Sequence, residues 1–209
     1  MNKSEDSIFS SAYLPPFDYF KVLHNSGRCL IEQWENYQKQ SFRNRCNIYG
    51  ANGLLSLIIP VDRSKGLSLP IKEITIDYGT NWQKGHWKAI ESAYNSSPFF
   101  EYYSSDFFSF YNKEHLFLFD FNTELTRLLI SLLGIETELS FTECYIKEYS
   151  KNDYRSVIHP KKKSPFENSN KKGQYHQVFA QKYGFIENLS VIDLLFNEGP
   201  ESLRYLEAD

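Results

Sequence analysis

The amino-acid sequence predicts an α/β fold in which a mixed β-sheet of short strands packs against helices, with a helical C-terminal portion. Short apolar or alternating segments, typical of strands, are interspersed with segments in which apolar residues recur every three to four positions. Such an order favours layers of helices on a sheet. The length of 209 residues and the hydrophobic content of 41% fit one domain over residues 1–209.

The first elements are predicted as strand, turn, helix and strand. Ile8 and Phe9 begin a short apolar segment, and residues 13–16 form a turn that contains two prolines. Apolar spacing over residues 17–23 predicts a helix with a proline at its start. Residues 29–31 predict a second short strand.

The middle of the chain is predicted to contain two strands and two helices. A buried strand is expected over the apolar run 54–59, which Pro60 closes, and a loop over 61–70. Alternation over 71–78 predicts a strand with one apolar face. Thr80 or Asn81 is an expected N-cap for a helix that begins at Trp82 and continues to Tyr94. Residues 99–110 predict an aromatic-rich helix.

The last part is predicted to be mainly helical. The apolar stripe over 124–133 predicts a helix that Gly134 ends. Alternation over 141–150 predicts one more strand. Residues 152–173 are basic and almost free of apolar side chains, so we expect a mobile loop. Two helices follow, over 175–183 and 192–196.

The charge balance excludes a general attraction to nucleic acid. The chain has 23 Lys and Arg against 26 Asp and Glu, a net charge of −3, so an anion site must be local. No apolar window is long enough to span a membrane, and the N-terminus lacks a continuous apolar signal core. We therefore expect a cytoplasmic protein without a membrane span.

Neither a metal site nor a cofactor motif is predicted. The cysteines Cys29, Cys46 and Cys144 are widely spaced without a CxxC pair, and His159 and His176 are not spaced as metal ligands. Buried structural thiols are expected for Cys29 and Cys46. The glycine-rich motifs that bind dinucleotides or nucleoside triphosphates are absent. No cofactor is expected.

The dense polar segment of residues 37–45, which precedes the run 54–59, is the strongest candidate site. We predict that it binds an anionic small molecule that carries a phosphate or carboxylate, through side chains that include two arginines. In an extended segment these arginines share one face, which suits forked hydrogen bonds to phosphate or carboxylate. The alternative is an exposed basic turn. The candidate substrate-binding residues are Tyr37, Lys39, Arg43, Asn44 and Arg45.

His86 is the candidate catalytic residue. Its imidazole titrates near neutral pH and could act as a general acid or base. The alternative is a hydrogen-bonded packing residue beside Trp82 and Trp87. The basic loop 152–173 also has two interpretations, a lid over a phosphorylated ligand or a solvated excursion.

Several segments resemble the WbqC-like protein family, from about Tyr13 to Tyr205. The similar segments are YLPPFDYF, YQKQSFRNRCNIYGANG, LIIPV, QVFAQKYGF and NLSVIDLLFNEG. One departure is Ser11-Ala12, where relatives often carry Gln-Pro. The positions that match the family pattern are Tyr13, Pro15, Tyr37, Lys39, Arg43, Asn44, Arg45, Pro60, Trp82 and His86.

The resemblance implies a role in bacterial surface-polysaccharide (O-antigen) biosynthesis. We expect an enzyme that acts on a nucleotide-linked sugar, with acyl or aminoacyl transfer to an amino sugar as the reaction. The alternative is a non-catalytic ligand-binding or scaffold protein of the same pathway. The sequence leaves the oligomeric state open.

Overall fold

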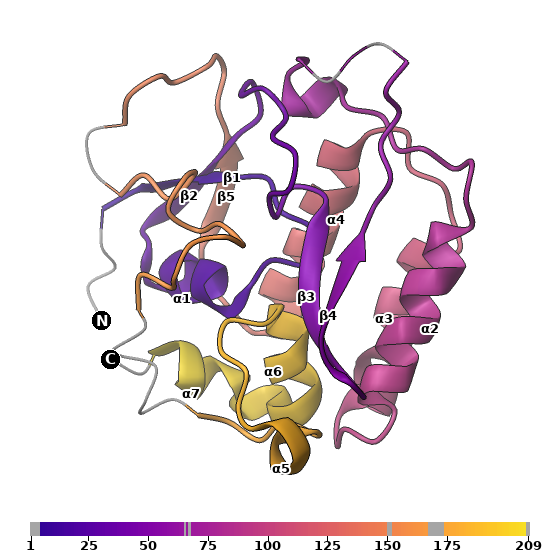
Figure 1. Ribbon diagram of the computed structural model, residues 1–209. Coiled ribbons are helices and arrows are strands. Elements are labelled where there is room, and N and C mark those ends of the chain that lie inside the picture. The colour runs from indigo at the N-terminus through magenta and orange to yellow at the C-terminus, as the bar shows by residue number, and fades with distance from the viewer. Residues whose placement is uncertain (1–4, 65, 67, 150–151, 167–173, 208–209) are drawn as a thin grey trace.

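Parallel and antiparallel strands are both present, together with packed helices, so the predicted α/β class is confirmed (Figure 1). The computed structural model describes residues 5–64, 66, 68–149, 152–166 and 174–207. Three strands form a parallel sheet in the order β1-β2-β5, and β3 and β4 form a separate hairpin. In the view of Figure 1 the hairpin stands between this sheet and the helices α2 and α3.

The N-terminal elements form a βαβ unit, as the sequence predicted. Strand β1 (Ser7–Ser10) leads through helix α1 (Phe17–Asn25) to strand β2 (Arg28–Glu32). The two strands pair in parallel, with Ser7 opposite Cys29. A parallel pair needs such a crossover because its two strands start at the same end. Strand β5 (Glu138–Phe141) pairs with the other side of β2.

The hairpin consists of β3 (Arg45–Gly50) and β4 (Gly53–Ile58), with Arg45 opposite Ile58. Gly53 has a φ of 99°, which a residue with a side chain rarely adopts. The prediction of a buried strand over 54–59 is wrong for β4, because Leu54 is 58% exposed and Ile58 is 46% exposed. Leu54, Ser56 and Ile58 share one face of β4 and are all exposed, so this face of the hairpin is open.

Helices cover the other face of the hairpin. Helix α2 (Trp82–Tyr94) packs against β3 and against α3 (Phe100–Tyr111). The predicted cap is confirmed, since the Asn81 side chain accepts a hydrogen bond from the Lys84 amide. Helix α4 (Leu118–Leu132) begins earlier than the predicted 124, and Gly134 follows it with a φ of 67°.

The C-terminal portion is helical, as predicted. It comprises α5 (Ala180–Tyr183), α6 (Val191–Glu198), the short 3₁₀ helix η3 (Gly199–Glu201) and α7 (Ser202–Glu207). Every residue of α6 from Val191 to Asn197 is buried, and the helix contacts α1, α3 and α7. The helix predicted over 175–183 is limited to α5.

Two strand predictions are wrong. Residues 71–78 form no continuous strand: Ile71–Glu73 is the 3₁₀ helix η1, and Thr75 and Ile76 form isolated bridges to Phe117 and Val61, because the amides of this stretch bond to different segments rather than to one neighbouring strand. Examples are Ile71 to the Glu35 carbonyl, Ile76 to Leu116 and Asp77 to Pro60. The strand predicted over 141–150 ends at Phe141, because the carboxylate of Glu32 accepts hydrogen bonds from the Thr142 hydroxyl and the Ile146 amide.

The first part of the basic loop packs on the parallel sheet. Asp153 forms a parallel bridge with Ile8, and the Tyr154 amide donates to the Ile8 carbonyl at 2.9 Å. The Tyr154 ring stacks on Phe9, with 5.6 Å between their centroids. These contacts fix the start of the loop beside β1. Residues 167–173 of the predicted loop lie outside the described residues.

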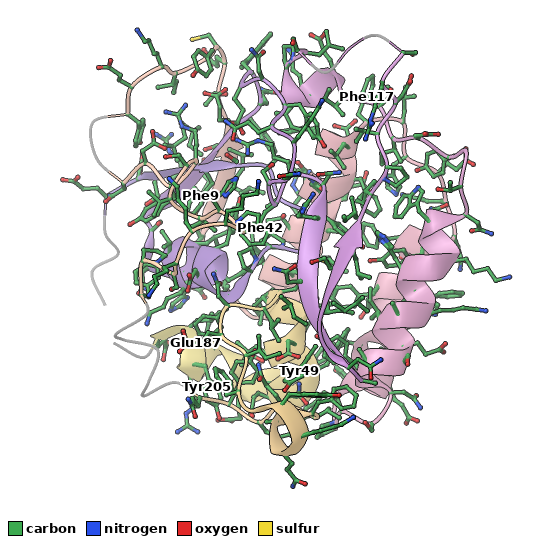
Figure 2. All side chains as sticks on the ribbon, viewed as in Figure 1. Phe9, Phe42, Tyr49, Phe117, Glu187 and Tyr205 are labelled. Atoms are coloured by element: carbon green, nitrogen blue, oxygen red, sulfur yellow. The ribbon has the colours of Figure 1, made fainter. Side chains whose placement is uncertain are left out.

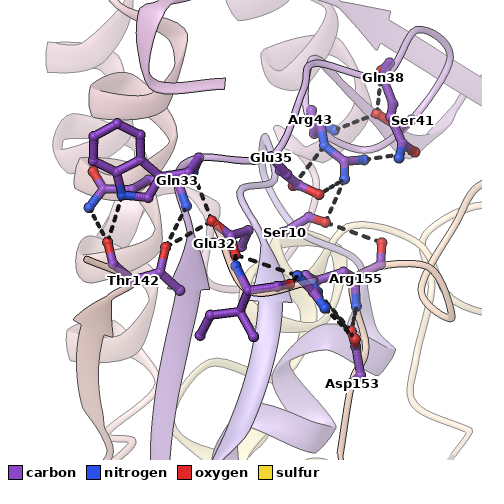
Figure 3. A network of polar contacts seen from close by, with 12 residues as sticks. Ser10, Glu32, Gln33, Glu35, Gln38, Ser41, Arg43, Thr142, Asp153 and Arg155 are labelled. Atoms are coloured by element: carbon purple, nitrogen blue, oxygen red, sulfur yellow. Dashed lines mark hydrogen bonds and ion pairs between the residues drawn. The ribbon is translucent and has the colours of Figure 1, made fainter. Parts of the chain in front are cut away.

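A buried ion pair joins the polar segment to the sheet (Figure 3). Arg43 Nε donates to Glu35 Oε1 at 2.9 Å, and both side chains are almost fully buried. Arg43 Nη2 also donates to the Ser10 hydroxyl at 2.7 Å, and that hydroxyl donates to the Arg155 carbonyl at 3.1 Å. The pair therefore links the end of β1, the polar segment and the basic loop.

A second buried carboxylate continues this network. Glu32, at the end of β2, is fully buried and accepts hydrogen bonds from the Trp34 amide and from Thr142. Arg155 contacts Glu32 at 3.4 Å and Asp153 at 2.6 Å. Because buried charges are tolerated only when they are paired and hydrogen-bonded, the network fixes these segments to one another.

Replacing Arg43 with Met should destabilise the protein strongly. Removing one partner of a buried ion pair leaves the other charge without compensation, which costs about 3–5 kcal/mol. Urea denaturation measures this loss in the free energy of unfolding. The Glu35→Leu/Arg43→Met double variant should recover much of the loss, because neither charge is then buried alone.

The exposed pair of Arg28 and Asp6 provides the matched control. Arg28→Ala should cost less than about 1 kcal/mol, as is usual for surface ion pairs. An Arg43→Met variant no less stable than Arg28→Ala would contradict the structural role of the buried pair.

Candidate functional site

A cavity of about 390 Å³ lies at the end of the hairpin where β3 begins and β4 ends. It brings together four of the five predicted substrate-binding residues and adds one arginine that the sequence did not single out. The residues that line it are Tyr37, Lys39, Gln40, Asn44, Arg45, Ile58, Ile59, Pro60, Val61 and Arg63. We name it the hairpin cavity.

Backbone and amide hydrogen bonds hold the walls of the hairpin cavity. The Ile59 amide donates to the Asn44 carbonyl at 2.8 Å, and the Asn44 side-chain amide donates to the Ile59 carbonyl at 2.8 Å. This pairing extends the hairpin by one step beyond the Arg45–Ile58 pair. On the opposite wall, the Tyr37 amide donates to the Leu69 carbonyl at 3.0 Å. The polar side chains are therefore presented from fixed backbone.

The hairpin cavity is positively charged. Lys39, Arg45 and Arg63 line it, and none of its described lining residues is acidic. Within the described ranges, these three side chains form no ion pair, whereas Arg28, Arg43 and Arg155 each do. In a protein of net charge −3, this is a local positive field.

The Tyr37 hydroxyl lies in this field. Burial raises the pKa of Tyr37, and the positive charges of Arg45, Arg63 and Arg43 oppose that rise. The hydroxyl is therefore protonated at neutral pH and can donate a hydrogen bond to an anionic or hydroxyl oxygen.

Two buried polar atoms at the hairpin cavity lack partners among the described residues. They are Arg45 Nε, a donor, and Asn44 Oδ1, an acceptor. Asn44 is only 6% exposed, and its amide nitrogen is already bonded to Ile59. Neither atom is exposed to water, so a ligand in the hairpin cavity can bond to them only when the surrounding side chains move.

The structure separates the two arginines that the extended-segment prediction placed on one face. Strand β3 begins only at Arg45, and Arg43, two residues earlier, is 2% exposed. Its guanidinium is bonded to Glu35, Ser10 and Gln38 and does not line the hairpin cavity. Arg43 therefore stabilises the fold around the hairpin cavity, whereas Arg45 lines the cavity itself.

Arg63 is the lining residue that the sequence reasoning missed. It lies in the segment 61–70, which its Gly, Ser, Pro and charge content marked only as a loop. The available signal was its position three residues after Pro60, which closes the same strand. A cation at that position emerges at the end of the hairpin where Arg45 also lies.

His86 lies in the core on helix α2 and is not among the residues that line the hairpin cavity. Its Nδ1 lies 3.0 Å from the Tyr13 hydroxyl, which in turn lies 2.7 Å from the Tyr111 hydroxyl. Burial lowers the pKa of His86 to about 4, and a hydrogen bond with the Ile58 backbone partly opposes this shift. The imidazole is therefore neutral at pH 7.

In the described part of the chain, no group of three or more His, Cys, Asp or Glu side chains is arranged to hold a metal ion. No helix in that part has both the length and the apolar character needed to cross a bilayer. Cys29 and Cys46 are buried, as predicted, and Cys144 is exposed.

His86 should make the stability of the protein depend on pH. The folded-state pKa of about 4 lies below the ordinary 6.5, so the unfolded state binds a proton first as the pH falls. The stability is fully present above pH 6.5 and decreases towards pH 4, by on the order of 3 kcal/mol. Denaturation at pH 7 and pH 4 measures this difference, which should shrink in His86→Gln.

His176, which is exposed, supplies the matched control. A His176→Gln variant should keep the pH dependence of the wild type, including the contribution of the buried His115. An unchanged difference in His86→Gln would show that His86 is not buried in its neutral form.

Comparison with known proteins identifies the family but no activity. The family model for the WbqC-like protein family matches residues 10–163 and 161–205. The uncharacterized protein Rv1507c of Mycobacterium tuberculosis (strain ATCC 25618 / H37Rv) is 27% identical over 227 residues, and the match covers 96% of each chain. No solved structure matches the chain significantly. With nearly its whole length matched, the chain belongs to the WbqC-like protein family.

Proposed function

We propose that the protein binds the phosphate groups of a nucleotide-linked sugar in the hairpin cavity, as part of bacterial surface-polysaccharide biosynthesis. The observation that carries the proposal is the set of three cations, Lys39, Arg45 and Arg63, around a cavity whose described lining contains no acid. Phosphate accepts charge-assisted hydrogen bonds from such groups, and arginine can bond it through two nitrogens at once.

The remaining lining residues support an oxygen-rich ligand. Arg45 Nε is a buried donor and Asn44 Oδ1 a buried acceptor, both without partners among the described residues. Tyr37 adds a hydroxyl, and Ile58 and Val61 add apolar surface. Ligand sites typically combine such apolar walls with a few placed polar groups in about 300–1,000 Å³. A diphosphate bound by the cations fits this chemistry, and Tyr37 and Asn44 orient it.

Neutralising the lining cations should weaken ligand binding. A charge-assisted hydrogen bond contributes about 1.5–3 kcal/mol, so Arg45→Gln or Lys39→Gln should raise the Kd by about 10- to 100-fold. Isothermal titration with inorganic pyrophosphate and with a panel of nucleotide-sugars measures the change. Lys88→Gln, on the exposed side of α2, is the matched control and should bind as the wild type does. Equal affinity in the Arg45 and Lys39 variants would remove the anion-site proposal.

The reaction we propose is acyl or aminoacyl transfer to an amino sugar. The amine nitrogen forms a bond to the acyl carbon, the bond from that carbon to its leaving group breaks, and a base takes the amine proton. His86 stays our prediction for the proton transfer. Its hydrogen bond with the Ile58 backbone connects it to a residue that lines the hairpin cavity.

Turnover in His86→Gln tests this role. We expect an unchanged Kd for the nucleotide-sugar and a loss of product of at least about 100-fold, typical of a general acid or base. Mass spectrometry of mixtures of nucleotide-sugars with acyl and aminoacyl donors detects the product. Full turnover in the folded variant would leave His86 with its packing role alone.

The rival function is a non-catalytic binding or scaffold protein. Exposed aromatic side chains on α3 favour it, because Tyr102 is 76% exposed and Phe108 is 41% exposed. Aromatic residues are enriched in protein–protein interfaces relative to the rest of the surface. A ligand that binds only the folded state raises the Tm, so a thermal-shift panel separates the two functions. A scaffold protein would show no shift with any nucleotide-sugar or donor.

A further inference from the structure

A second cavity, of about 240 Å³, lies on the same open face of the hairpin. It is enclosed by the hairpin, by the described part of the basic loop and by the segment before α6. The residues that line it are Phe42, Asn47, Leu54, His159, Pro160, Lys162, Lys163, Ser164, Ile186, Glu187 and Asn188. Two of these, Phe42 and Glu187, are labelled in Figure 2. We name it the loop cavity.

The two cavities adjoin along β3. Arg45 lines the hairpin cavity and Asn47 lines the loop cavity. Residues two apart in a strand point to the same face and are about 7 Å apart. On β4, Ile58 lines the hairpin cavity and Leu54, four residues earlier, lines the loop cavity. A group attached to a phosphate in the hairpin cavity can therefore reach the loop cavity.

Hydrogen bonds fix the walls of the loop cavity. The Lys162 amide donates to the His159 carbonyl at 2.9 Å, which closes a turn. Lys161 Nζ donates to the side chain of Gln40, which lines the hairpin cavity. This hydrogen bond connects the described part of the basic loop, a wall of the loop cavity, to the rim of the hairpin cavity. On the other side, the Ser190 amide donates to the Asn47 carbonyl at 2.8 Å.

The loop cavity offers chemistry different from that of the hairpin cavity. Its cations are balanced in part by Glu187, and it adds two amides, a hydroxyl and an imidazole beside the apolar surface of Phe42 and Leu54. Neutral hydroxyl groups need such mixed donors and acceptors, whereas phosphates need cations. Burial and then the positive charges of Arg43, Lys162, Lys161 and Arg45 lower the pKa of His159, so its imidazole is neutral at pH 7.

We propose that the two cavities are subsites of one elongated site, in which the hairpin cavity holds the diphosphate and the loop cavity holds the sugar attached to it. This inference rests on the proposed function and goes further by assigning the basic loop as a wall of the sugar subsite. Lys162, Asn188 and Glu187 then contact the sugar, and Leu54 packs against its ring.

Filling the loop cavity tests the proposal. Leu54 is 58% exposed, so Leu54→Trp adds a ring to this cavity without disturbing the core. Isothermal titration with pyrophosphate, UDP and UDP-N-acetylglucosamine compares the ligand parts. We expect at least a tenfold loss of affinity for UDP-N-acetylglucosamine, and affinities for pyrophosphate and UDP within twofold of the wild type. Leu116→Trp, 66% exposed and outside both cavities, should change none of them.

A second variant avoids added bulk. Lys162→Gln should weaken binding of UDP-N-acetylglucosamine several-fold and leave the affinity for pyrophosphate unchanged, with Lys88→Gln as control.

Unchanged binding of the nucleotide-sugar in both loop-cavity variants overturns the proposal. Equal weakening of UDP in Leu54→Trp also overturns it, since the nucleoside would then occupy the loop cavity. A wild type that binds neither pyrophosphate nor any nucleotide-sugar refutes the proposed function itself. A wild type that binds pyrophosphate as tightly as the nucleotide-sugar refutes only the sugar subsite.

Discussion

The buried ion pair of Arg43 and Glu35 is the interaction on which the site depends. Both side chains are almost fully removed from water, where an unpaired charge would be strongly unfavourable. Their pairing fixes the polar segment after β2 against the end of β1, because Arg43 donates a hydrogen bond to the Ser10 hydroxyl. That hydroxyl in turn donates to the Arg155 carbonyl in the basic loop. The segment that carries Tyr37, Lys39, Asn44 and Arg45 is therefore held by a buried charge pair as well as by backbone hydrogen bonds.

Two arginines two residues apart take opposite roles because of where the strand begins. Arg43 precedes β3, and its guanidinium is hydrogen-bonded to the buried carboxylate of Glu35. Arg45 is the first residue of β3 and lines the hairpin cavity with a donor left unpaired among the described residues. A cation that is already paired contributes to the fold, whereas one without a partner provides binding energy for an anion. The proposed diphosphate site follows from this division.

The open face of the hairpin explains why both cavities lie where they do. A two-stranded hairpin covered by α2 on one side leaves Leu54 and Ile58 exposed on the other. The polar segment, the basic loop and the segment before α6 approach this face and enclose space rather than fill it. Segments distant in the chain meet near this face, since Gln40 and Lys161 are 121 residues apart.

The sequence by itself determined the α/β class, the βαβ start, the Asn81 cap, the Gly134 helix end and four of the side chains that line the hairpin cavity. These features rest on local periodicity, capping and charge density, which act within a few residues. The sequence also contains the segments that resemble the WbqC-like family. The tertiary structure alone decided that Arg43 is paired with Glu35, that neither 71–78 nor 142–149 forms a strand, that Arg63 joins the cavity and that His86 is enclosed with Tyr13. Each of these four features depends on contacts between segments that are distant in the chain. Hydrogen bonds between such segments decide which backbone amides pair in a strand, and ion pairs between them decide which charged side chains remain available to a ligand.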